Sequence, residues 1–327
     1  MRQHITLLTG ILIATSSLLS ACGGAGQSSG SSSSSSSSSG GVKEHTFFIG
    51  STAPTKKFRS DYAEAWQLIA TQFQGTWGEV EGTRGTYKWQ TMDDFYNFAR
   101  NNKILFHYSS LISGAQQPNW SNNLDPEQTK LEIEDWVSQL CSRYKDADFI
   151  TVVNEPSPGH QPARHAQMAF GDDWIIKSFE LARKNCPNSM LLVNEYELFS
   201  KPYDDFIRLI SPSVNLGLID GIGIEGGDLK GVPAASITAV LNDIGNRFQL
   251  PIYITDLIVA GSDDVQLAQM QEQFPALYNH PKVRGITFAS DLENETWFSN
   301  SGLFYQDHTP RPAMQWVQDY VKAHPKN

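Results

Sequence analysis

The feature that most constrains this chain is an alternation of short apolar segments with longer segments of helical periodicity, which begins near Lys43. Continuous short apolar runs indicate strands buried on both faces, and apolar residues every three or four positions indicate amphipathic helices. We expect eight strands, at 45–50, 72–77, 104–107, 149–154, 190–194, 217–224, 252–256 and 285–289. We expect helices between and after them, at 61–70, 91–101, 126–144, 172–185, 202–210, 233–248, 265–278 and 312–323.

Eight strand and helix units within roughly 285 residues predict a single (β/α)8 TIM barrel, a fold of the α/β class. A doubly wound open sheet is the alternative fold for such a pattern. It is less consistent with this chain, because no glycine-rich phosphate loop follows the first expected strand. In a barrel of this kind, functional side chains gather at the carboxyl ends of the strands.

Residues 1–21 have a basic start, a short apolar stretch and small residues at their end, which is typical of a secretory signal peptide. The stretch is too short to span a bilayer comfortably. Its end, at 19–22, resembles the lipobox of bacterial lipoproteins, which implies that Cys22 becomes the lipidated first residue of the mature chain. An ordinary signal peptide with an incidental cysteine is the alternative. We expect an exported protein, anchored by lipid to the bacterial outer membrane or cell surface.

Residues 22–42 form the next region, which is almost entirely glycine and serine and includes an unbroken serine run at 31–39. Such a composition predicts a flexible tether with a root-mean-square reach of about 25 Å. The folded domain therefore comprises residues 43–327. Within it, Cys141 and Cys186 fall in helices that we expect to be neighbours, so either a disulfide or two buried thiols is consistent with the sequence.

The charge and the histidine spacing exclude several classes of function. A net charge of −10 argues against a nucleic-acid partner, because binding to phosphates needs a basic surface. The histidines show no spacing typical of metal ligands, so we expect neither a metal nor another cofactor. We expect a monomer whose partners are a polysaccharide substrate and, through Cys22, a membrane surface.

Polar residues stand at the ends of four consecutive expected strands. They are Asn154-Glu155, Asn194-Glu195-Tyr196, Glu225 and Asp256. Carboxylates that converge on one rim suit the cleavage of glycosidic bonds, in which one group donates a proton and another attacks the sugar or activates water.

Motifs along the folded domain resemble those of family 10 glycoside hydrolases, (β/α)8 enzymes of retaining mechanism that are mainly endo-β-1,4-xylanases. The similar segments are 75–85 with Trp89, 116–120, 152–156, 194–196, 220–224, 250–256, 285–288, Trp297 and 310–313. The resemblance implies that Glu155 is the general acid/base and that Asp256 occupies the nucleophile position. It also implies that Asn154 binds a sugar hydroxyl.

The other candidates for substrate contact are Tyr196, Glu225, Gln117, Trp120, Trp297 and His107. Trp120 and Trp297 are candidate stacking platforms for sugar rings, with core packing as an equal alternative for each. His107 ends an apolar strand, so a hydrogen-bonded core histidine is as consistent with the sequence as a ligand contact.

The chain departs from the family pattern at several sugar-binding positions. The family's nucleophile is a glutamate, one methylene longer than Asp256, and its Gln-x-His motif is replaced by Glu225-Gly226-Gly227. The family's Glu-Asn-x-x-Lys motif after the second strand is absent, and residues 72–76 stand in its place. The tryptophan that the family has near position 289 is Ala289. The histidine and the tryptophan that follow the family's third strand are replaced by residues 111–114.

Three interpretations follow from these departures. In the first, the enzyme is an inverting hydrolase with Glu155 as acid and Asp256 or Glu225 as base, because the shorter side chain leaves room for a water. In the second, Asp256 is still the nucleophile and the barrel is repacked to bring it forward. In the third, catalysis is lost and the groove only binds polysaccharide.

Overall fold

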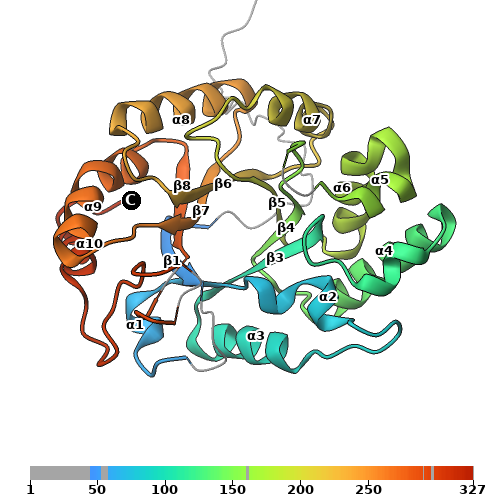
Figure 1. Cartoon of the computed structure of the whole chain (residues 1–327), viewed down its shortest axis with the longest axis horizontal. Coiled ribbons are helices and arrows are strands. Elements are labelled where there is room, and N and C mark those ends of the chain that lie inside the picture. Colours follow the sequence, from blue (N-terminus) through green and yellow to red (C-terminus); the bar gives the residue numbers. More distant parts are fainter. Residues whose placement is uncertain (1–44, 53–57, 160–161, 290, 296–297, 327) are drawn as a thin grey trace, which may run out of the picture. The chain divides into compact units, whose positions relative to one another are not determined.

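A computed structural model of the protein describes residues 45–52, 58–159, 162–289, 291–295 and 298–326, all within one compact unit. Eight parallel strands pair in sequence order, and β1 pairs with β8 to close a barrel that helices surround (Figure 1). The strands are β1 (Phe48–Thr52), β2 (Leu68–Ala70), β3 (Leu105–Ser113), β4 (Phe149–Asn154), β5 (Met190–Glu195), β6 (Gly221–Asp228), β7 (Ile252–Ile258) and β8 (Val283–Phe288). The predicted (β/α)8 barrel is confirmed.

The helices follow the strands in the order that the sequence pattern predicts. They are α1 (Tyr62–Ala65), α2 (Trp77–Val80), α3 (Gln90–Asn102), α4 (Pro126–Arg143), α5 (Arg164–Phe170), α6 (Trp174–Asn185), α7 (Asp204–Asn215), α8 (Ala234–Phe248), α9 (Asp263–Tyr278) and α10 (Pro312–Ala323). Short 3-10 helices lie at η1 (Phe73–Gly75), η2 (Asn119–Asn123) and η3 (Gly171–Asp173). The short helix α5 has no counterpart in the sequence prediction.

The position of the second strand was predicted wrongly. The expected strand at 72–77 is instead η1 and the start of α2, and β2 lies inside the helix expected at 61–70. Tyr62, Trp66 and Ile69 are spaced like one face of a helix, and all three are buried. The chain turns after α1, however, and β2 pairs on both sides, with β1 and with β3. A three-residue strand is too short to show a period of its own.

The barrel interior has an apolar layer beneath a polar one. Phe48, Phe149 and Tyr253 fill the lower layer, with ring centroids 5.3 Å apart for Phe48–Phe149 and 5.1 Å for Phe149–Tyr253. Above them, the buried His107 ring shares a hydrogen bond of 2.9 Å with Thr151 Oγ1. The rigid apolar layer therefore supports the side chains at the carboxyl ends of the strands.

A disulfide joins Cys141 of α4 to Cys186 at the end of α6, and both residues are buried. Of the two states that the sequence allowed, the structure therefore shows the bridged one. The bridge ties together two outer helices that are 45 residues apart in sequence.

We expect the Cys141→Ala/Cys186→Ala variant to lose about 2–4 kcal/mol in the free energy of unfolding, because a long loop is no longer closed in the unfolded chain. Urea denaturation followed by circular dichroism measures this loss. Wild-type protein whose bridge has been reduced is the control, and it should show a similar loss. Equal stability of the oxidised wild type and the variant would contradict the prediction.

A cavity of about 410 Å³ lies away from the carboxyl ends of the strands, and its lining includes Phe47, Tyr278 and Lys326. Its walls come from the start of β1 and the segment before it, from α1, and from α9, α10 and the residues after α10. In barrels of this type the active site lies at the carboxyl ends of the strands. This cavity also brings no pair of carboxylates together. We therefore place the candidate site at the carboxyl ends of the strands, in spite of the small cavities there.

Candidate active site

Four carboxyl side chains come from the ends of four adjacent strands. Glu155 follows β4, Glu195 ends β5, and Glu225 and Asp256 lie in the carboxyl-terminal halves of β6 and β7. Strand register pairs Glu225 with Thr255, so that Asp256 is next to the partner of Glu225. This arrangement brings Glu155, Glu225 and Asp256 to one rim of the barrel.

The backbone is unusual at both proposed catalytic positions. Glu155 has φ 51° and Asp256 has φ 48°, in the left-handed region that residues with a side chain seldom adopt. The β7–β8 register also shifts between Ile254 and Leu257, which marks an irregularity around Asp256. Such strain persists only where the surrounding structure enforces it, and bulges near active sites change the direction in which a side chain points.

Asn194 is the centre of the hydrogen-bond network at this rim. Its Nδ2 donates to Asn154 Oδ1 at 2.7 Å and to Glu225 Oε1 at 2.8 Å. Its Oδ1 accepts from Thr255 Oγ1 at 2.6 Å, which leaves the amide in one orientation. Gly223 lies against it so closely that an added Cβ would be 2.4 Å from Asn194 Oδ1. The network thus links β4, β5, β6 and β7 through one buried side chain.

The carboxyl groups change one another's acidity. Burial first, and then the charges of Asp256, Glu155 and Glu195, raise the pKa of Glu225 well above its usual range. Burial and the charge of Glu155 raise the pKa of Asp256 to about 6. Burial also raises the pKa of Glu195, although its carboxylate accepts backbone hydrogen bonds. Perturbed carboxyl groups that converge at a strand end are typical of a catalytic site.

A narrow cavity of about 10 Å³, room for about one water molecule, opens beside Asp256. Its polar lining includes Thr71, His107, Ser109, Asn194 and Thr287. His107 thus belongs both to the buried polar layer and to the wall of the site. Burial lowers the pKa of His107 to about 4, so its ring is neutral at neutral pH and adds no positive charge.

Tyr196 lies next to the carboxyl cluster. It follows β5 directly, is half-buried, and its backbone N–H donates to Glu195 Oε1 at 3.1 Å. Burial and the surrounding carboxylates, Glu155 among them, raise the pKa of its phenol. Asn154 belongs to the same group, because its Oδ1 accepts a hydrogen bond from Asn194 Nδ2. The structure therefore brings Asn154, Tyr196 and the carboxyl groups together.

Trp120 lies in η2 and packs against α2 and the segment that follows it. Its Nε1 donates to the Glu81 backbone oxygen at 2.7 Å, and its ring packs edge-on to Trp77 with centroids 5.7 Å apart. The Arg84 guanidinium carbon lies 5.7 Å from its ring centroid. These contacts favour the packing interpretation of Trp120 over the stacking platform.

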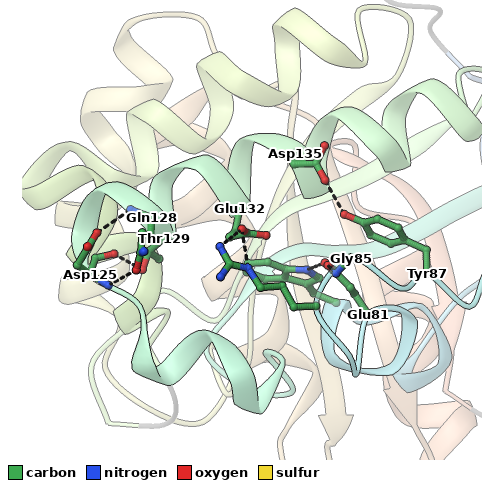
Figure 2. Close-up of polar contacts among 10 residues, drawn as sticks. Glu81, Gly85, Tyr87, Asp125, Gln128, Thr129, Glu132 and Asp135 are labelled. Atoms are coloured by element: carbon green, nitrogen blue, oxygen red, sulfur yellow. Dashed lines mark hydrogen bonds and ion pairs between the residues drawn. The ribbon is translucent and has the colours of Figure 1, made fainter.

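The segment that follows α2 is fixed against α4 (Figure 2). The Glu81 carboxylate is buried and accepts hydrogen bonds from Trp77 Nε1 at 2.7 Å and from the Gly85 N–H at 2.6 Å. Arg84 Nε donates to Glu132 of α4 at 2.9 Å. The segment 75–85, which resembles a family motif, therefore uses the Glu81 carboxylate to hold a loop in place and does not present it to a sugar.

Gln117 lines a different small cavity, together with His165 and Ser113. Its Nε2 donates to Asn122 Oδ1 at 2.8 Å. The side chain thus lies along the loop after β3, outside the group around Asp256. Two further predicted residues, Trp297 and the lipidation site Cys22, fall outside the described residues, as do the predicted signal peptide and tether.

Sequence reasoning gave no role to two residues that organise the site, Asn194 and Thr255. A signal was present, since Asn194-Glu195 follows its strand as Asn154-Glu155 follows the preceding one. The register indeed pairs Asn154 with Asn194.

In the described part of the chain, no group of three His, Cys, Asp or Glu side chains is arranged to hold a metal ion. No helix among those described is both long and apolar enough to cross a membrane.

Comparison with known structures shows the fold. Xylanase 10B from Thermotoga petrophila RKU-1, in complex with xylobiose, matches 85% of this chain and 94% of its own with a TM-score of 0.75 and 21% identity. Native xylanase 10B from Thermotoga maritima matches 85% of this chain and 95% of its own with a TM-score of 0.74 and 21% identity.

Comparison with known sequences shows the family. Endo-1,4-beta-xylanase B of Cellvibrio japonicus (strain Ueda107) is 42% identical over 271 residues, which are 83% of this chain and 45% of that protein. The chain thus spans less than half the length of that relative. Endo-1,4-beta-xylanase 3 of Hypocrea jecorina is 26% identical over 72% of this chain and 70% of its own. The family model described as Glycosyl hydrolase family 10 matches residues 41–320, and this chain belongs to that family.

Proposed function

We propose that the protein is an endo-acting glycoside hydrolase that cleaves the β-1,4 linkages of xylan, with Glu155 as general acid/base and Asp256 as nucleophile. The observation that carries this proposal is the convergence of Glu155 and Asp256 on one rim, close enough that the charge of Glu155 raises the pKa of Asp256. The substrate class rests on the relatives, which are named as endo-1,4-beta-xylanases.

The proposed reaction has two steps. The Asp256 carboxylate attacks the anomeric carbon while Glu155 donates its proton to the leaving glycosidic oxygen, which gives a glycosyl ester on Asp256. Glu155 then accepts a proton from a water that attacks the same carbon, and Asp256 is released as a carboxylate. With a pKa of about 6, Asp256 is ionised at neutral pH, as a nucleophile must be.

The backbone around Asp256 supports direct attack. An aspartate withdraws its carboxylate by about 1.5 Å relative to a glutamate, the length of one C–C bond. The positive φ of Asp256 and the register shift around it change the direction of the side chain, and we infer that they offset the missing methylene. This is the second of the three interpretations that the sequence left open.

The water-sized cavity beside Asp256 supports a competing route, in which Asp256 activates a water and the product is inverted. The two routes differ in the anomer first released. We expect NMR of freshly cleaved xylooligosaccharides to show the β-anomer first, before mutarotation. Initial release of the α-anomer would instead assign Asp256 as the base of an inverting reaction.

The first experiment is incubation of the purified protein with xylans, mixed-linkage glucans and other β-glycans, followed by measurement of new reducing ends. We expect xylan to be cleaved internally into oligosaccharides. If no glycan in the panel is cleaved but the protein still binds xylan, and Glu155→Gln leaves that affinity unchanged, the protein is a non-catalytic binding protein and the hydrolase proposal fails.

We also propose that the exported protein is a monomer held at the bacterial outer membrane or cell surface by lipid on Cys22. A cysteine placed after a short apolar leader and before a Gly/Ser tether supports this proposal. We expect the wild-type protein to partition with the detergent phase and Cys22→Ala to stay in the aqueous phase. Equal partitioning of the two would contradict lipidation.

A further inference from the structure

We propose that Glu225 is present in the site as a neutral carboxylic acid, and that its proton is what allows Asp256 to carry the negative charge. This inference rests on the proposed function, because it assigns Glu225 a positioning role beside the nucleophile. It extends that function by explaining how four carboxyl groups share one strand-end rim.

The position of Glu225 in the barrel places it between the other acids. It lies on β6, which pairs with β5 on one side and with β7 on the other. Glu195 ends β5 and Asp256 lies on β7, so negative groups flank Glu225 on both sides, and Glu155 acts on it from the end of β4. Like charges this close cannot all be ionised.

The charged groups that act on Glu225 most strongly are all carboxylates, namely Asp256, Glu155 and Glu195. His107 is the titratable base in the wall beside Asp256, and burial lowers its pKa to about 4, which leaves it neutral. The neutral amide of Asn194 donates a hydrogen bond to Glu225. In the described part of the site, therefore, no positive charge compensates a second carboxylate.

The other carboxyl groups are better suited to carry charge. Glu195 accepts two backbone hydrogen bonds, from Ser157 at 2.9 Å and from Tyr196 at 3.1 Å, and such donors favour the ionised form. Asp256 borders a cavity that admits about one water, which can solvate its charge. Glu225 is not among the residues that line this cavity, so its charge would lack that water. Glu225 is thus the member that keeps its proton.

The hydrogen-bond network also fixes where that proton lies. Because Asn194 Nδ2 donates to Glu225 Oε1, Oε1 is the carbonyl oxygen of the acid and the hydroxyl is at Oε2. The acid therefore presents one acceptor and one donor, as an amide does. Glu225→Gln reproduces this pattern without a group that titrates, and Glu225→Ala removes the acceptor for Asn194.

The first test measures stability and needs no activity. In the unfolded chain a glutamate ionises near pH 4.3, but the folded protein keeps Glu225 protonated to higher pH. A group with a raised folded pKa costs stability as pH rises above its unfolded value. We therefore expect the Tm of Glu225→Gln, relative to wild type, to rise steadily from about pH 4 upward. Glu272→Gln, on the exposed surface of α9, is the control with the same charge change, and its Tm difference should not vary in this way.

The second test uses the pH dependence of kcat/KM. If Glu225 is neutral, Glu225→Gln leaves the acidic midpoint, set by Asp256, near pH 6. If Glu225 were ionised, the same substitution would remove a neighbouring negative charge and lower that midpoint by about one pH unit or more. A lowered midpoint, or a Tm difference for Glu225→Gln that is constant with pH, overturns the proposal. If the wild type cleaves no glycan, the proposed function fails, but the stability test still decides the state of Glu225.

Discussion

Asp256→Asn is expected to lower kcat/KM on xylan by about 10⁴-fold or more, because the amide neither attacks the anomeric carbon nor activates a water as a carboxylate does. The loss should be similar for every substrate, since each needs the same attack. Initial rates of reducing-end formation, measured at pH 7 where Asp256 is ionised, give the ratio. Activity within tenfold of wild type would show that Asp256 is not the reacting carboxylate.

Glu155→Gln is expected to behave differently, because its role is to protonate the leaving oxygen. We expect a loss of about 10²–10⁴-fold on xylan and a much smaller loss on an aryl xylobioside with an acidic phenol, whose leaving group needs no proton. The contrast between the two substrates therefore separates the acid from the nucleophile. Equal losses on both substrates would remove Glu155 from the acid role.

A third substitution tests whether the backbone around Asp256 offsets its short side chain. If the irregularity in β7 already brings the carboxylate forward, Asp256→Glu places it about 1.5 Å too far, and we expect a loss of about 10²-fold. Asp319→Glu, on the exposed surface of α10, is the control, because it adds the same methylene without approaching the site. A gain of activity in Asp256→Glu would show that the aspartate is too short for direct attack.

Much of the fold followed from periodicity because most strands of this barrel are continuous apolar runs. β4 was predicted with the bounds that the structure has, and α10 likewise. The exception, β2, has only three residues, and its neighbours Tyr62 and Trp66 are buried at a helix-like spacing. The extended conformation of β2 is determined by its pairing with β1 and β3. The hydrophobic pattern of the segment itself does not show this pairing.

The candidate site was predictable to the extent that it depends on strand ends. Glu155 and Asp256 were identified because each follows or ends an apolar strand in a family-like motif. The role of Asn194 was not predicted, because it depends on the register that aligns β5 with β4 and β6. Trp120 and Gln117 are in family-like motifs too, but Trp120 contacts the α2 region and Gln117 contacts its own loop. Sequence alone does not distinguish such contacts from sugar contacts.

A buried ion pair joins Arg59 to Asp291. Arg59 Nε lies 3.1 and 3.0 Å from the two oxygens of Asp291, and Trp66 Nε1 donates to the same carboxylate at 2.8 Å. The Arg59 guanidinium also lies over the Phe304 ring, 3.9 Å from its centroid. The pair thus ties the segment after β1 to the segment after β8, where the barrel closes.

We expect Asp291→Ala to lower the free energy of unfolding by about 3–5 kcal/mol, because it leaves the Arg59 guanidinium buried without its main partner. Burial raises the pKa of Asp291 more than Arg59 lowers it, so the pair is not strongly stabilising by itself. The cost of the substitution is instead the buried guanidinium, which keeps only its ion pair with Asp61 at 2.7 Å. Urea denaturation at pH 7 measures it. The double variant Arg59→Met/Asp291→Leu, which removes both charges, should be more stable than Asp291→Ala. If the double variant is the less stable of the two, the buried charge of Arg59 does not determine the loss. The hydrogen bond to Trp66 and the ring contact with Phe304 then determine it.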